Sequence, residues 1–183
     1  MHLFTFTSII VAFLLFFAAL KIYKLEKSSF NLFFAISTFF VGMWSLFFSI
    51  LYLEHNKENQ WILYKSGMVF AIFALPVFFQ SVISLIKKAT GKTSVPGLVL
   101  LIFVYVVCGM ALFKLFTGVF IVKDFVYGTM GTYVIRDLKT PFYLIWHITI
   151  HIPYIFLVIY MIYLKITGKY KDSLERKQLM IIF

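Results

Sequence analysis

Acidic side chains are scarce in this chain of 183 residues, which has seven Asp and Glu against 17 Lys and Arg. All seven lie between long apolar runs or at their ends, at Glu26, Glu54, Glu58, Asp124, Asp137, Asp172 and Glu175. Carboxylates for acid–base catalysis are therefore missing from the apolar runs. The sequence also lacks a glycine-rich phosphate loop, a nucleophile elbow and an H-E-x-x-H zinc motif. We expect no enzymatic turnover from this chain alone, and no cofactor.

Cysteine is nearly absent as well. Cys108 is the single one, so no disulfide can form within the chain. It stands among Val and Gly in the middle of an apolar run, and we interpret it as an inert, packed thiol.

Charged residues make up only 13% of the chain and hydrophobic residues 62%, which leaves too little polar surface for a soluble fold. Crossing a bilayer takes about 20 mostly apolar residues in a helix. Five runs meet or nearly meet that length, and short charged links separate them: Leu3–Leu20, Phe30–Leu53, Trp61–Ile86, Gly97–Val122 and Phe142–Leu164. The sequence therefore predicts an all-α membrane protein, a polytopic bundle of transmembrane helices in one domain over residues 1–183.

A sixth apolar run begins near Leu179 and reaches only Phe183, which is too short to span. We interpret the chain as the front part of a longer protein.

The net charge of +10 is at first sight typical of a nucleic-acid binder, but the positions of the charges indicate membrane topology instead. Eleven Lys and Arg follow the first, third and fifth runs: Lys21, Lys24, Lys27, Lys87, Lys88, Lys92, Lys165, Lys169, Lys171, Arg176 and Lys177. Five accompany the second and fourth links: Lys57, Lys65, Lys123, Arg136 and Lys139. Excess Lys and Arg mark the cytoplasmic side. We predict a multi-pass protein of the cell membrane with an external N-terminus, whose partner is the lipid bilayer and not a nucleic acid.

The external link between the fourth and fifth runs, Lys123–Asp137, holds two β-prone stretches around Gly128-Thr129-Met130-Gly131. This pattern predicts a small β-hairpin. An isolated hairpin is marginally stable, so it must lean on the helix ends. Two interpretations stay open: a compact connector, or a lid over a ligand pocket.

Polar residues inside membrane helices are costly and often functional. Tyr143, His147, His151 and Tyr154 follow one another at spacings of 4, 4 and 3, which places them on one helix face. Two histidines four apart can bind a metal, but no Asp, Glu or Cys accompanies them in that run, so we predict no metal site. A hydrogen-bonded polar seam between helices is the more common use of such a face, and titration of a histidine near neutral pH is a third.

Lys114 lies about 25 Å along the fourth run from Gly97, at 1.5 Å per residue, and so near the external boundary. Lys114, Tyr143, His147 and His151 are the candidate ligand-binding residues, in an outer pocket suited to an anion. The alternative for Lys114 is a lysine that extends its amine to water.

Small and polar residues also mark faces of the second and third runs. Thr38, Gly42, Ser45 and Ser49 share one face of the second run, which favours close helix packing. Gln80, Ser81 and Ser84 lie in the cytoplasmic half of the third run, and we interpret them as packing contacts.

Scattered residues along most of the chain, with the basic links and the hairpin, resemble a known family. They are Phe30-Asn31-Leu32-Phe33, Trp44, Trp61, Pro76-Val77-Phe78-Phe79 and Glu175-Arg176-Lys177-Gln178. The pattern resembles the N-terminal seven-helix sensor region of bacterial histidine kinases and related diguanylate cyclases. The resemblance implies a bundle that ends in the cytoplasm and feeds a PAS, kinase or cyclase domain, with homodimer formation through that missing output domain.

We therefore interpret the chain as a membrane-embedded sensory domain for an external or membrane signal. Two alternatives stay open: a fragment of a polytopic transporter, whose helices would be broken near Pro76 and Pro153, or a lipid-modifying membrane protein. A soluble domain after one further helix would favour the sensor, and more apolar helices would favour the transporter.

Overall fold

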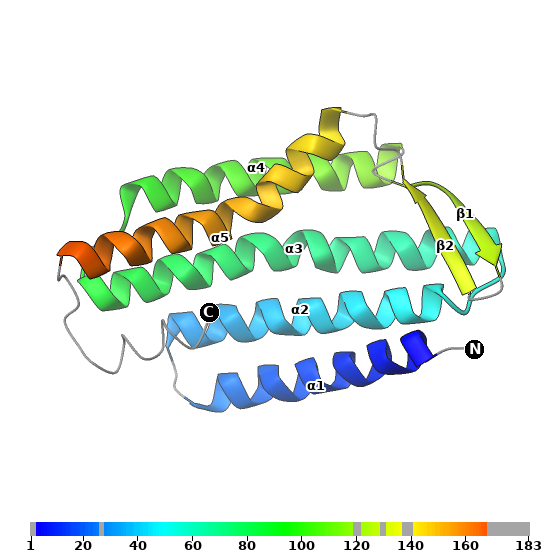
Figure 1. Cartoon of the computed structure of the whole chain (residues 1–183), viewed down its shortest axis with the longest axis horizontal. Coiled ribbons are helices and arrows are strands. Elements are labelled where there is room, and N and C mark those ends of the chain that lie inside the picture. Colours follow the sequence, from blue (N-terminus) through cyan, green and yellow to red (C-terminus); the bar gives the residue numbers. More distant parts are fainter. Residues whose placement is uncertain (1–2, 26–27, 119–121, 129–130, 137–140, 168–183) are drawn as a thin grey trace.

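A computed structural model describes residues 3–25, 28–118, 122–128, 131–136 and 141–167 (Figure 1). The elements within these residues are α1 (Leu3–Leu25), α2 (Ser29–Leu51), α3 (Lys57–Thr90), α4 (Val95–Thr117), β1 (Val122–Gly128), β2 (Gly131–Arg136) and α5 (Pro141–Thr167). The predicted start of a sixth run near Leu179 lies outside the described residues.

Four of these helices, α1 to α4, are long and apolar enough to cross a membrane, with mean hydropathies of 1.9 to 2.6. Their outward faces carry exposed Phe, Leu and Ile, such as Phe13 on α1 and Phe113 on α4, as contact with lipid requires. The fifth predicted run falls on α5, whose apolar part, Leu144–Tyr160, is at the short end of the range for a span. The chain thus has the composition and helices of a membrane protein.

Helix α3 is the centre of the molecule and supplies most of the fully buried side chains, including Ile72, Phe79 and Leu85. Figure 1 shows α1, α2 and α3 side by side in that order, with α4 and α5 on the other side of α3. The N-terminus and the hairpin lie at the same end of the bundle, called here the cap end. The α1–α2 and α3–α4 links lie at the opposite end.

The helix starts follow from polar capping residues. The Ser28 hydroxyl accepts a hydrogen bond from the backbone N–H of Asn31 (3.2 Å), and the Ser94 hydroxyl accepts one from Gly97 (3.2 Å). The Asn56 side chain accepts the N–H of Glu58 at 2.8 Å, so α3 begins at Lys57 and not at the predicted Trp61. Gly91, at φ 71°, ends α3 in the left-handed conformation that glycine adopts without strain.

The predicted end of the fourth run was wrong. Helix α4 ends at Thr117, and Val122 begins β1, where it pairs with Arg136 and is 2% exposed. An apolar run does not by itself distinguish a helix from a buried strand, so the hydrophobic signal continued past the true helix end.

The predicted hairpin is confirmed. Strands β1 and β2 pair antiparallel, Gly128 lies opposite Gly131, and an irregularity at Lys123 separates the Val122 and Asp124 pairs. The turn residues Thr129 and Met130 lie outside the described residues.

The predicted small-residue face of α2 does pack closely. A Cβ on Gly42 would lie 2.6 Å from Cε1 of Phe16 on α1, and the Ser45 hydroxyl donates to the carbonyl of Ser8 on α1 (3.2 Å). Gln80 also joins two helices, because its amide oxygen accepts from the Tyr105 hydroxyl of α4 at 3.0 Å. These contacts hold helices together without charged groups.

Candidate functional site

The hairpin docks on the α2–α3 link through a buried hydrogen-bond cluster around Thr132, which is 1% exposed. The Thr132 N–H donates to the carbonyl of Tyr52 (3.1 Å), and its hydroxyl donates to the carbonyl of Glu54 (2.8 Å). Gln60, 2% exposed, donates from Nε2 to both the Glu54 carbonyl (2.7 Å) and the Thr132 hydroxyl (3.1 Å). These bonds fix β2 directly over the first turn of α3.

Aromatic side chains make the second attachment of the hairpin. Phe125 of β1 is 2% exposed, and its ring centroid lies 4.8 Å from that of Trp61 and 5.8 Å from that of Tyr64 on α3. The His55 and Tyr127 rings lie 4.0 Å apart at the rim. Edge-to-face packing of buried rings adds to the energy of their burial, so Phe125 is the main apolar anchor.

The charged side chains around the docked hairpin are exposed and interact only weakly with one another. Lys57 Nζ lies 3.2 Å from an oxygen of Asp124. The backbone N–H of Phe125 lowers the pKa of Asp124 most, with a further contribution from Lys57. The pKa of Glu54 is lowered chiefly by the N–H of Asn56. Both carboxylates are therefore ionised at neutral pH, while the buried Thr132 and Phe125 contacts carry the docking.

The cap therefore joins parts of the bundle that are distant in sequence. The hairpin follows α4 and precedes α5, yet its docking contacts are with the α2–α3 link and the start of α3. A shift of α4 or α5 that pulls the hairpin away from α3 breaks these contacts.

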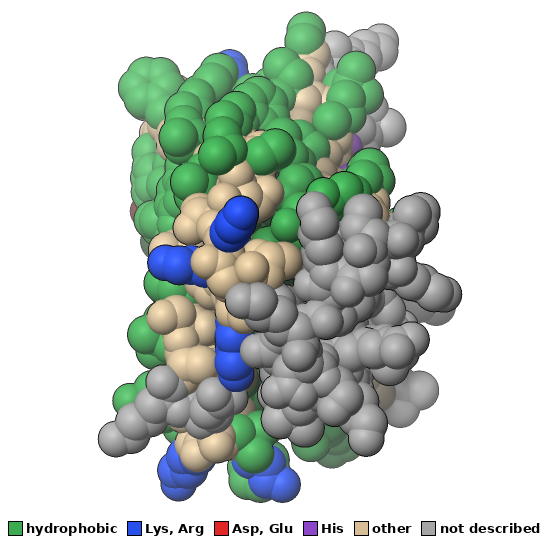
Figure 2. Space-filling view, turned by 90° about the vertical axis from the view of Figure 1, so that its left-hand side faces the viewer, with side chains coloured by type: hydrophobic (Ala, Val, Ile, Leu, Met, Phe, Trp, Pro, Cys, Tyr) green, Lys and Arg blue, Asp and Glu red, His purple; other side chains and the backbone are tan. Residues whose placement is uncertain are grey.

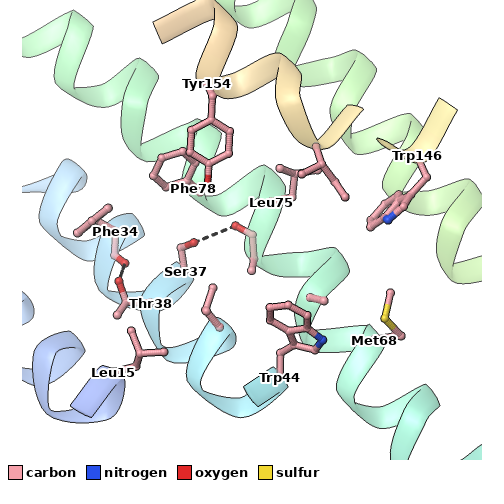
Figure 3. A pocket seen from close by; sticks show the side chains of 14 residues that line it. Leu15, Phe34, Ser37, Thr38, Trp44, Met68, Leu75, Phe78, Trp146 and Tyr154 are labelled. Atoms are coloured by element: carbon pink, nitrogen blue, oxygen red, sulfur yellow. Dashed lines mark hydrogen bonds between the residues drawn. The ribbon is translucent and has the colours of Figure 1, made fainter. Parts of the chain in front are cut away.

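Beneath the cap, a cavity of about 360 Å³ lies between α2, α3 and α5 (Figure 3). We call it the groove. Its lining residues are Leu15, Phe34, Ser37, Thr38, Val41, Trp44, Met68, Ala71, Ala74, Leu75, Phe78, Trp146, Ile150 and Tyr154. Figure 3 shows Tyr154 and Trp146 pointing in from α5, and Trp44 pointing in from α2. No Asp, Glu, Lys, Arg or His is among these described lining residues.

Two hydroxyls of the groove are already used within the bundle. Ser37 donates to the carbonyl of Ala74 on α3 (2.9 Å), and Thr38 donates to the carbonyl of Phe34 one turn earlier (2.8 Å). Tyr154 packs its ring against Phe78 at 5.3 Å, and Trp44 packs against Phe48. Neither the Tyr154 hydroxyl nor the Trp44 indole N–H has a hydrogen-bond acceptor among the residues that the structure describes.

The predicted outer-pocket residues are placed as follows. Lys114 lies in the last turn of α4, exposed, with Nζ 5.5 Å from the centre of the Phe142 ring. On α5, His147 is half-buried and His151 is exposed, and neither lines the groove. The side chain of Tyr143 lies outside the described residues. The anion pocket therefore stays a prediction, and of the predicted polar face it is Tyr154 that lines the groove.

Sequence reasoning missed the groove itself. A usable signal was present on α3, where Ala71 and Ala74 are three residues apart and thus neighbours on one face. Trp44 was a second signal, since tryptophan is enriched at membrane interfaces and this one stands within a helix run.

Cys108 is buried in the core, as predicted. The described residues hold no group of three potential metal ligands.

No protein-family model, no curated protein and no solved structure matches this chain.

Proposed function

We propose that this chain is the membrane-embedded sensory region of a bacterial signal-transduction protein, which relays an external or membrane signal to a cytoplasmic output domain such as a histidine kinase. The observation that carries the proposal is the pairing of an uncharged groove with a docked cap. The groove lies between α2, α3 and α5, and the cap docks β2, the element that precedes α5, on the α2–α3 link. A ligand in the groove would touch the same helices that the cap connects.

Signal transfer requires two helix arrangements that the ligand binds with different affinity. Phe78 of α3 and Tyr154 of α5 both line the groove, and their rings are in contact. A ligand that separates these rings would move α5 relative to α3. Figure 1 shows α5 bending along its course. Pro153 removes one backbone donor from this helix, which lowers the cost of such a bend.

The charge distribution supports a cytoplasmic location for the end opposite the cap. Eleven of the 17 Lys and Arg follow the first, third and fifth apolar runs; of these, Lys21, Lys24, Lys87, Lys88 and Lys92 are described at this end, where Figure 2 shows basic side chains. The described basic residues on the cap side are Lys57, Lys65, Lys114, Lys123 and Arg136. The described acidic residues Glu54, Glu58 and Asp124 all lie at the cap end. Because excess Lys and Arg stay on the cytoplasmic side, the proposal places the cap and the N-terminus outside.

This orientation predicts opposite labelling at the two ends. In a Cys108→Ser background, a membrane-impermeant thiol reagent should label Val126→Cys in intact cells and should label Lys92→Cys only after the membrane is opened. Val126 is 48% exposed on β1, and Lys92 is exposed in the α3–α4 link. Labelling of Lys92→Cys from outside would overturn the orientation.

Signalling itself is tested in the complete gene product that carries this chain, reconstituted in nanodiscs with ATP. We expect phosphate transfer to a histidine whose rate changes when the cap is released by Phe125→Ala, while Val126→Ala on the other face of β1 leaves it unchanged.

The variants Lys114→Met and His147→Phe test the predicted outer pocket: if it receives the signal, they lose the response and still accumulate normally. Solute uptake into liposomes without phosphate transfer would instead favour a transporter.

One observation weighs against the transporter alternative. Helix α3 continues through Pro76 from Lys57 to Thr90, so it is not one of the broken helices typical of transporters.

A further inference from the structure

We infer that the groove binds a neutral, single-chain lipid that carries a carbonyl oxygen. The inference rests on the proposed function, because this compound class would be the signal that the sensory region receives.

The shape of the groove suits a chain that lies along the helices. Ala71 and Ala74 of α3 form a low floor between larger residues, and the lining runs from Phe78 to Met68 on that helix. Ten residues of helix correspond to about 15 Å. The volume of about 360 Å³ lies in the range of small-ligand sites.

The lining excludes a charged ligand. The described lining residues include no ionisable group other than the Tyr154 phenol, so nothing in the groove would offset an ionised carboxylate or amine. An unpaired charge is strongly disfavoured at membrane depth. A fatty acid anion or a cationic amphiphile is therefore disfavoured against a neutral compound.

The Tyr154 hydroxyl is a hydrogen-bond donor on the lining of the groove, and it calls for an acceptor. Tyr154 is the middle residue of α5, and its hydroxyl, like the Trp44 indole N–H, has no acceptor among the described residues. Tyr154 is 50% exposed, and at the middle of a membrane helix this exposure is to lipid hydrocarbon, where a donor without a partner is costly. A carbonyl oxygen accepts from the Tyr154 hydroxyl without bringing a charge.

The depth of Tyr154 also separates this ligand from ordinary phospholipid. A phospholipid keeps its polar head at the membrane surface and presents only hydrocarbon at the middle of a spanning helix. A ketone or quinone carbonyl is not bound to a charged head and can reach the Tyr154 hydroxyl. The proposed ligand and bulk phospholipid bury similar hydrocarbon in the groove. The ligand is therefore selected by one hydrogen bond to Tyr154 and not by the apolar area that it buries.

The test uses tryptophan fluorescence of the chain in nanodiscs, since Trp44 and Trp146 line the groove and a bromine atom on a bound alkyl chain quenches a nearby indole. The probe is a brominated long-chain ketone, and the matched control is the brominated alkane of equal length. We expect saturable quenching by the ketone at a concentration about tenfold lower than for the alkane, as one added hydrogen bond predicts.

Three variants assign the effect. Tyr154→Phe keeps the ring and removes the hydroxyl, so the ketone should lose its advantage over the alkane. Ala71→Leu fills the floor and should weaken both probes more than tenfold. Tyr163→Phe, on an exposed part of α5 outside the groove lining, should change neither.

Other outcomes overturn the inference. Equal saturable quenching by a brominated phospholipid would show that ordinary lipid fills the groove. Absence of saturable quenching by either probe would show that the groove does not take an alkyl chain, and an unchanged ketone advantage in Tyr154→Phe would remove the assigned contact. The assay reads binding alone, so the proposed signalling function can still hold if the ketone fails, and binding can hold if phosphate transfer is absent.

Discussion

Replacing Phe125 with alanine should detach the hairpin from α3 while leaving the membrane helices in place. The Phe125 side chain is 2% exposed and packs on Trp61 and Tyr64. Removing a buried phenyl ring typically costs about 3–5 kcal/mol, through lost burial and the cavity left behind. A two-stranded hairpin has little stability of its own, so this loss is enough to populate the undocked state.

Amide hydrogen exchange at Thr132 measures this detachment, because its N–H is protected by the bond to the Tyr52 carbonyl. At 1.4 kcal/mol per factor of ten, exchange at Thr132 should rise at least about a hundredfold in Phe125→Ala. Val126→Ala is the matched control, since Val126 is the next residue of β1 and 48% exposed. Equal exchange in both variants would mean that the cap is held by contacts other than the Phe125 ring.

The helices were predictable because each carries a long apolar run, and four of them meet the length and hydropathy of a membrane span. The hairpin was predictable too, because β-prone residues flank a pair of glycines. The boundaries at Trp61 and Val122 were wrong for two different reasons. Asn56 caps a first helical turn of polar residues, Lys57–Gln60, which hydropathy does not detect, and Val122 continues the apolar pattern into a strand.

The groove depends on which helix faces meet, and a sequence of one chain contains no direct record of that. His147 and His151 were predicted as ligand-binding residues because they are polar residues in a membrane run. The face of α5 that lines the groove instead carries Trp146, Ile150 and Tyr154. At 100° per residue, Tyr154 lies within the predicted polar face and at the edge of the groove face, which is why the pattern found it. The docking of the hairpin on Gln60 and Thr132 joins residues 72 positions apart and was not predictable from local pattern.

Gly42→Leu should separate α1 from α2. A Cβ at this position would lie 2.6 Å from Cε1 of Phe16 and 3.4 Å from the carbonyl oxygen of Ala12, and the further carbons of leucine need space that α1 occupies. Overpacking of this kind costs about 1–3 kcal/mol or more. Gly42→Ala is the informative intermediate: the Phe16 ring can rotate away, and alanine gains about 1 kcal/mol of helix propensity over glycine, so its net effect should be close to zero.

Thiol cross-linking measures the α1–α2 contact directly. In a Cys108→Ser background, Ser8→Cys and Ser45→Cys should be joined by a short bifunctional reagent, since the Ser45 hydroxyl lies 3.2 Å from the Ser8 carbonyl oxygen. Adding Gly42→Leu should reduce the yield severalfold, whereas Gly42→Ala should retain it. Gly109→Leu on α4 is the control, because a Cβ there meets nothing within 4 Å and the same substitution should leave the yield unchanged. An unchanged yield in Gly42→Leu would show that α1 packs on α2 loosely enough to absorb a whole side chain, and the close approach at Gly42 would then contribute little to the stability of the bundle.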